Sequence, residues 1–217
     1  MGTINPTQGS RQAIIAHSRL IHPNTLIGTP QDCSGDFAWG ITCYHGYVEN
    51  AADTNPGYFV LVGSSAASGD DDWVELRRFT AKGTDPDFVN FNATEAAGQT
   101  DLTVDVITGL AVGDLLYLQD TNGGSPSGST GALSSPETLS EWRFMRKAVS
   151  TTVTIAVAIT NGKDSSDDIY NDASQFYAAL DTTPLKRLNV WFVHEGATGA
   201  NCDVLVYGVA LTELATA

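Results

Sequence analysis

The chain has 217 residues, of which 42% are hydrophobic and 17% charged, and it carries a formal net charge of −14 with a pI near 4.3. Phosphate contacts need lysine and arginine, and the chain has 11 of these, so the charge balance argues against a nucleic-acid partner and against an anionic membrane surface. No apolar run approaches the roughly 18 residues of a membrane span, and residues 1–10 carry no secretory signal pattern.

Short runs of alternating apolar and polar residues recur along the chain, and no stretch keeps a helical period, so the pattern predicts an all-β protein. Residues 1–10 are polar and interrupted by Pro6 and Gly9, which favours an extended arm; a terminus without fixed structure is the alternative. Pro23 restricts the second apolar run to a sheet edge or a connection. The first strands are expected at residues 12–18, 21–27, 37–48, 58–62 and 73–79.

From about Thr94 the character of the chain changes to shorter strands separated by glycine-rich turns. The Gly113-Asp114 pair predicts a tight turn, because both residues tolerate the conformations that such turns need. These strands are expected at residues 100–106, 115–118, 141–147 and 152–159. They predict a small inserted β-barrel over residues 94–160. A unit of about 65 residues is marginal alone, so we expect it to pack on a larger body.

The last part of the chain contains two clear strands, residues 187–194 and 203–211, while residues 175–180 fit either a strand or a short helix. Two strands cannot stand alone, so they are expected to complete the sheet begun near the N-terminus. The predicted fold is therefore all-β: a jelly-roll-like β-sandwich built from N- and C-terminal segments with a small inserted β-barrel. The expected divisions are an arm at 1–10, a sandwich at 11–93 plus 161–217, and the insert at 94–160.

Cysteines and histidines are too scattered to predict a metal site or a disulfide framework. The cysteines are Cys33, Cys43 and Cys202, and the histidines are His17, His22, His45 and His194. One disulfide between two of the cysteines stays open as an alternative. So does a zinc site of three ligands, Cys33, Cys43 and His45. The main expectation is hydrogen-bonded histidines within or at the ends of strands.

Acidic residues gather in three loop regions, at Asp70–Asp72, at Asp164 to Asp168 and at Asp120 to Gly123. Clustered oxygen ligands on loops are what Ca²⁺ needs, but none of these runs has the spacing of a known calcium loop. Solvated loop charges are therefore the main expectation. A specific calcium site is the alternative.

No residue pattern in the chain predicts catalysis. Glu75, Glu141 and Glu195 have no context that marks a pair of catalytic carboxylates, and the nucleophile elbow, phosphate loop and dinucleotide fingerprint are all missing. We therefore predict that the protein is not an enzyme, with no catalytic, cofactor-binding or metal-binding residues and no cofactor.

Two further sets of side chains suggest contacts with partners. The tryptophans Trp39, Trp73, Trp142 and Trp191 lie within or beside strands, so we expect core packing or a subunit interface, with a sugar platform as the alternative. Arg143, Arg146 and Lys147 form a basic patch in an acidic chain. This patch could meet the Asp70–Asp72 loop of another copy; a solvated strand face is the simpler interpretation.

Several segments resemble virion structural proteins of tailed bacteriophages, particularly accessory head proteins of the decoration or cement type. The segments are residues 54–62, 72–75, 108–120, 140–143, 187–190 and 203–207. The resemblance implies a repeated subunit that clamps neighbouring capsomers of the major capsid protein, often as a homotrimer, without catalysis. It also implies a place on the phage head, assembled in the host cytoplasm. The alternative is a carbohydrate- or host-receptor-binding β module of a phage tail, which would need an exposed aromatic platform.

Overall fold

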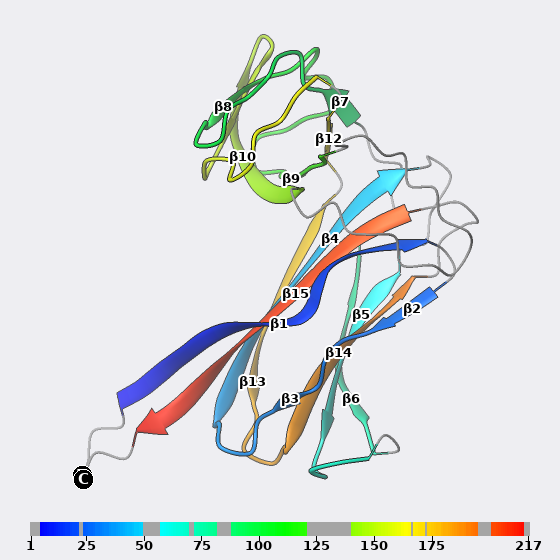
Figure 1. Ribbon diagram of the computed structural model, residues 1–217, viewed down its shortest axis with the longest axis vertical. Helices are drawn as coiled ribbons and strands as arrows, with labels where there is room; N and C mark the ends of the chain where they lie inside the picture. The colour runs from blue at the N-terminus through cyan, green and yellow to red at the C-terminus, as the bar shows by residue number, and fades with distance from the viewer. Residues whose placement is uncertain are drawn as a thin grey trace.

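A computed structural model describes residues 5–21, 24–49, 57–69, 72–81, 88–120, 140–165, 167–171, 173–194 and 201–214 (Figure 1). Of these residues 63% lie in strands and none in a helix, so the predicted all-β fold is confirmed. Among them, accordingly, no helix is long and apolar enough to span a membrane.

Two antiparallel sheets form the sandwich, which we call the body. Sheet A has the order β1 (Asn5–Ile21), β15 (Asn201–Leu214), β4 (Ala38–Glu49) and β13 (Ser174–Asp181). Sheet B has the order β2 (Asn24–Ile27), β14 (Arg187–His194), β5 (Tyr58–Ser64) and β6 (Val74–Thr80), with β3 (Gln31–Asp32) beside β14. As expected from Pro23, the second run forms an edge strand. The ambiguous run at 175–180 is a strand, β13.

The strand order defines the body as a jelly roll. Strand β3 is left out of this numbering. When the other eight strands of the body are numbered one to eight in chain order, the strand order is 1-8-3-6 in sheet A and 2-7-4-5 in sheet B. Each of these neighbours pairs antiparallel. Eight antiparallel strands that alternate between two packed sheets in this way form a double Greek key, the jelly-roll architecture. The predicted jelly-roll sandwich is therefore confirmed by topology.

The core of the body lies between sheets A and B. Strand β14 turns Leu188, Val190 and Phe192 inward, as its alternation of apolar residues requires. Strand β5 is buried along almost its whole length, in agreement with its continuous apolar run. Full burial of each such side chain contributes about 1.5–3 kcal/mol relative to exposure. This apolar contact holds the two sheets together.

Strands β1 and β15 extend past the sandwich as a two-stranded ribbon (Figure 1). Their pairing begins at Asn5 opposite Leu214, whereas the pairing of β15 with β4 ends at Leu211 opposite Ala38. Within the predicted arm at 1–10, residues 5–10 are extended, and their backbone pairs with the C-terminal strand of the same chain. Residues 1–4 lie outside the described residues.

A third, six-stranded sheet forms the insert, and it runs β7-β12-β9-β10-β11-β8. The strands are β7 (Phe88–Asn90), β8 (Asp101–Thr103), β9 (Leu115–Leu118), β10 (Glu141–Val149), β11 (Thr152–Ile155) and β12 (Asp168–Tyr170). The sheet curls around its own apolar core, and a bridge between Phe91 and Val104 connects its two edges (Figure 1). The predicted turn is present, with Gly113 at a φ of +99°.

The insert is larger than the sequence predicted. The expected bounds of 94 and 160 leave out β7 and β12, yet β12 pairs with both β7 and β9. Strand β9 needs this neighbour, because all four of its residues are buried and its second edge would otherwise be unpaired. The six-stranded sheet therefore extends from Phe88 to Tyr170.

Candidate functional site at the seam between body and insert

The three cysteines and the histidines His45 and His194 are buried in the body. All three cysteines are free thiols, and burial raises the pKa of Cys33 and Cys43 to about 12. His45 lies in the interior of the body, where burial first and the charge of His194 second lower its pKa to about 3. Within the described ranges no group of three or more His, Cys, Asp or Glu residues could hold a metal ion. His22 lies outside those ranges.

The acidic loop candidates have local partners where they are described. Asp72 accepts a hydrogen bond from Ser64 and pairs with Arg187 at 3.0 Å, and the Ser64 hydrogen bond is the main cause of its lowered pKa. The backbone N–H of Asp164 donates to Asp167 at 2.9 Å. Asp70, Asp71 and residues 121–123 lie outside the described residues.

The carboxylates singled out in the sequence are not brought together as a pair. Glu75 is exposed on β6 and pairs with Arg78 at 2.7 Å. Glu141 is buried in the insert and is described below. Glu195 lies outside the described residues.

The four tryptophans form no open platform. Trp39 and Trp142 are buried, and the indole N–H of Trp39 donates to Asp36 at 2.8 Å. Trp73 and Trp191 are half-buried and pack edge to face with ring centroids 6.5 Å apart. Of the basic patch, Arg143 is bound within its own chain, while Arg146 and Lys147 are exposed.

A buried ion pair lies where the insert covers the outer face of sheet A. Asp203 on β15 is fully buried and receives two hydrogen bonds from Arg19 on β1, at 2.8 and 2.9 Å. Tyr117 of the insert donates a third hydrogen bond to the same carboxylate. Burial alone would raise the pKa of Asp203, but the neighbouring His17 and Arg19 outweigh it and hold the pKa below its usual value. Tyr117 thus ties the insert to the body.

Gly46 on β4 makes room for this contact. A Cβ atom at Gly46 would lie 2.6 Å from the ring of Tyr117, closer than real Cβ contacts. Gly46 pairs with Asp203 across the sheet, so the missing side chain and the buried carboxylate face the same tyrosine. Around it, Trp142, Tyr170 and Leu115 of the insert pack with residues of sheet A in a separate apolar cluster. We call this contact region the seam.

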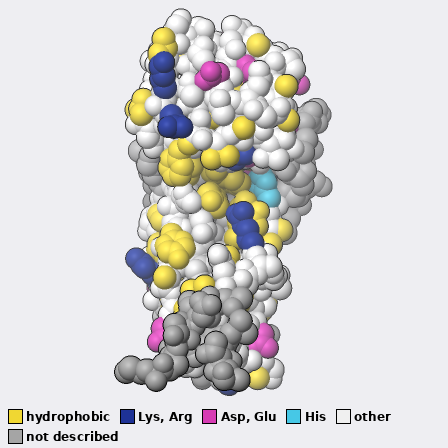
Figure 2. Space-filling model, turned by 90° about the vertical axis from the view of Figure 1, so that its left-hand side faces the viewer, with side chains coloured by type: hydrophobic (Ala, Val, Ile, Leu, Met, Phe, Trp, Pro, Cys, Tyr) yellow, Lys and Arg dark blue, Asp and Glu magenta, His cyan; other side chains and the backbone are white. Residues whose placement is uncertain are grey.

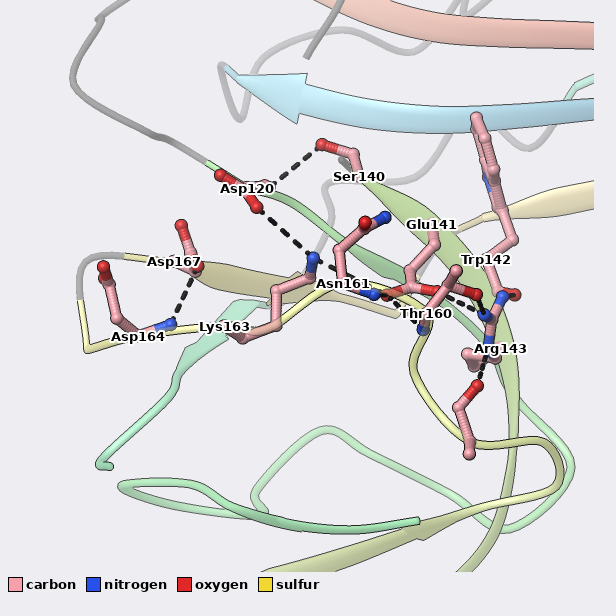
Figure 3. Close-up of polar contacts among 11 residues, drawn as sticks. Asp120, Ser140, Glu141, Trp142, Arg143, Thr160, Asn161, Lys163, Asp164 and Asp167 are labelled. Atoms are coloured by element: carbon pink, nitrogen blue, oxygen red, sulfur yellow. Dashed lines mark hydrogen bonds and ion pairs between the residues drawn. The ribbon is translucent and has the colours of Figure 1, made fainter. Parts of the chain in front are cut away.

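A second charged network lies inside the insert, beside the seam (Figure 3). Lys163 is buried, with its Nζ atom 3.5 Å from Asp120 and 3.6 Å from Glu141. Glu141 also accepts hydrogen bonds from Arg143 and from the backbone N–H of Thr160. The network ties the start of β10 to the segment after β11. In Figure 3 Trp142 points away from it, toward the strands of the body.

Two grooves open on the outer face of sheet A. The lower groove has a volume of about 710 Å³ and lies between the ribbon and β13. The upper groove, the seam groove, has a volume of about 370 Å³ and lies between body and insert. Figure 2 shows this side of the molecule, where hydrophobic, basic and histidine side chains gather below the insert.

The sequence did not predict the seam. Arg19 lies between two predicted strands, and Asp203 and Tyr117 lie within predicted strands whose patterns do not set them apart from their neighbours. One signal was present: Tyr117 lies in a run whose other residues are all leucine, in a segment expected to pack on a larger body.

Comparison of the sequence with protein-family models and with curated proteins gives no match. Among solved structures, the chain is similar to a chain of the infectious bursal disease virus Gx strain, with a TM-score of 0.21 and 12% identity over 98% of this chain and 80% of that one. A chain from T=1 particles derived from infectious bursal virus gives a TM-score of 0.20 and 9% identity, over 99% and 79%. These TM-scores are too low to carry an argument, so the jelly-roll assignment rests on strand order.

Proposed function

We propose that the protein is a structural component of a virus particle, and within that class a decoration or cement subunit of a phage head. In this role it binds the major capsid protein and associates with copies of itself, with a trimer as the expected state. Jelly rolls occur in viral capsid proteins but also in lectins and cupins, so the fold supports the role without deciding it. The argument therefore rests on the surface.

The observation that carries the proposal is the outer face of sheet A together with the ribbon. Among the described residues that line the lower groove, Asp181 is the one charged side chain, although the chain as a whole carries 36. Tyr177 is 64% exposed there, beside Val209 and Leu211. The groove is also lined by Phe37 and Trp39. Few charges together with aromatic residues are typical of the centre of protein–protein interfaces.

The ribbon adds backbone hydrogen-bonding groups to this face. At its tip β1 pairs with β15 alone, and residues 5–10 carry no charge. A two-stranded ribbon is marginally stable by itself in water, and its open edges can pair with a strand of another chain. A subunit that clamps neighbours needs such an edge next to an apolar face. The strong net charge keeps free subunits soluble before they assemble.

The test is binding to expanded capsids that were assembled without this subunit, imaged by cryo-electron microscopy. We expect density at regular lattice positions. Tyr177→Asp on the lower groove should reduce occupancy at least tenfold, roughly 1.4 kcal/mol of binding free energy. Val157→Asp on the insert is the matched control, because Val157 is 65% exposed and does not line the lower groove. Deletion of residues 1–10 should also weaken binding. Absence of regular density would refute the decoration role.

A further inference from the structure

The seam groove lies where ligand sites are most often found, at an interface between two structural units. Sheet A supplies Arg11, Tyr44 and Tyr207 to its walls, and the insert supplies Trp142 and Thr160. Its volume of about 370 Å³ falls within the usual range of ligand pockets, which begins near about 300 Å³. A groove of this size accommodates a small ligand rather than a protein segment.

One wall of the groove is aromatic. The rings of Tyr44 and Trp142 lie 5.5 Å apart between centroids and are tilted by 39°, which makes an angled corner. Tyr207 lies on the same face of sheet A and is half-buried. Flat apolar ring faces of this kind pack against the C–H faces of a saturated ring. This corner differs from the open tryptophan platform considered from the sequence, because it is recessed and mostly tyrosine.

The groove carries a positive charge that is available to a ligand. Arg11 is exposed, and its guanidinium group lies 3.2 Å from the centroid of Tyr207, which holds it against the ring. No carboxylate in the described part of the chain forms an ion pair with Arg11. The other arginine, Arg143, is different, since its donors are used by Glu141, Thr160 and two backbone carbonyls. Arg11 is therefore the group that can meet an anion.

The insert also lines the groove with polar side chains. Thr160 carries a hydroxyl group and Asn161 an amide, whereas the Ser140 hydroxyl accepts a hydrogen bond from the backbone N–H of Asp120 and Glu141 is paired with Arg143. Together the groove offers an arginine fork, an aromatic corner and polar side chains. A carboxylate matches the fork, an apolar ring face matches the corner, and ligand hydroxyl groups match the polar wall.

We propose that the seam groove binds a sugar acid, that is, a single sugar ring that carries a carboxylate. The carboxylate pairs with Arg11, the ring packs against Tyr44 and Trp142, and the ring hydroxyl groups contact Thr160. The proposal stands apart from the decoration role, because it concerns a different groove and a small ligand. A decoration subunit with this site would add recognition of acidic glycans to its structural task.

The test uses the full chain and three probes: methyl glucuronide, methyl glucoside and acetate. Trp142 in the groove wall reports binding through its fluorescence, and saturation-transfer NMR reports it from the ligand. We expect methyl glucuronide to bind with a dissociation constant of about 1 mM, and both methyl glucoside and acetate to bind at least tenfold more weakly. Equal binding of the glucuronide and the glucoside, or equal binding of acetate, would overturn the proposal.

Arg11→Gln tests the residue assignment. Arg11 is exposed, so the variant should fold, and circular dichroism checks that it does. We expect affinity for methyl glucuronide to fall at least tenfold. Arg77→Gln is the matched control, because Arg77 is also exposed and also lies over an aromatic ring, that of Phe79 on β6. A folded Arg11→Gln variant that binds like the parent, or a parent without saturable binding, would refute the site.

Discussion

The body and the insert bury their ionised side chains in different ways. Between sheets A and B the core is an apolar cluster of 16 buried residues, and the buried pair Arg19–Asp203 lies outside it, on the far face of sheet A. That pair is buried because the insert covers it. The insert instead keeps Lys163, Asp120 and Glu141 within its own fold, beside a core of 11 buried residues.

This difference indicates that the seam couples the two parts energetically. A buried ion pair contributes little net stability, but removal of one partner leaves an uncompensated charge. If the insert separated from the body, Arg19 and Asp203 would gain water and lose Tyr117. The short strands of the insert, several of three or four residues, give it few backbone contacts of its own. We therefore expect the insert to depend on the body more than the body depends on the insert.

The largest expected effect comes from Asp203→Ala. This change leaves the Arg19 guanidinium buried without its carboxylate and removes the acceptor of Tyr117, so we expect a loss of about 3–5 kcal/mol in the free energy of unfolding. Urea denaturation followed by circular dichroism measures it. Asp181→Ala changes an exposed aspartate on the same sheet that accepts hydrogen bonds from Thr183, and it should cost only about 1 kcal/mol.

The same variant tests whether the seam couples the insert to the body. If the seam couples the two parts, the parent unfolds in one transition, and Asp203→Ala should split it, with the insert unfolding first. Hydrogen exchange resolved along the chain separates β7–β12 from the other strands. Equal loss of protection in both parts, or a change below about 1 kcal/mol, would contradict the coupling.

The strands of the body could be predicted from the sequence because each is marked by a local pattern of apolar residues. The alternation in β14 and the continuous apolar run of β5 identify these segments as strands. The number and order of the predicted strands then favour a sandwich of two sheets. The bounds of the insert were missed because β7 and β12 have three residues each, too few to show a period. The pairing of residues 5–10 was not predicted, because their partner, the end of β15, lies some 200 positions away.

The seam was missed for a related reason. Asp203 alternates with buried neighbours, which places it on the outer face of its sheet, and a charged residue on an outer face is normally solvated. The cover comes from Tyr117, which is 86 positions distant. Only the three-dimensional arrangement could reveal that this face is dry. The seam groove depends on the same arrangement, since its walls come from both parts.

Acid should destabilise the protein through a buried histidine of the body. The pKa of His45 is about 3 in the folded chain, against about 6.5 when unfolded, so between these values the unfolded chain binds a proton that the folded chain does not. Stability is therefore complete above pH 6.5 and falls with pH, by about 1.4 kcal/mol per unit and roughly 3 kcal/mol by pH 4.5. The segment 88–170 contains no histidine, so this acid effect arises in the body and reaches the insert only through the seam.

Unfolding in urea at several pH values between 7 and 4.5 checks this. His45→Leu removes the titrating group, and its stability should fall more gently with pH, with about one proton fewer taken up on unfolding. His17→Gln is the comparison variant on the outer face of sheet A. Parallel pH slopes for the parent and His45→Leu would show that the buried histidine does not set the acid sensitivity. The carboxylates with lowered pKa values act below this window; they are Asp32, Asp72, Glu75, Asp181 and Asp203.

The smallest effect is expected from Gly46→Ala, which tests the seam without removing any charge. The added Cβ would meet the Tyr117 ring at 2.6 Å, so the ring must move away from sheet A, at a cost of about 1–3 kcal/mol. Because Tyr117 packs against Trp142 with ring centroids 4.8 Å apart, tryptophan fluorescence should shift as well. Gly35→Ala is the matched control, since its Cβ would meet nothing within 4 Å. If both variants were equally stable, Tyr117 could shift away from sheet A without cost, and the seam would not couple the two parts.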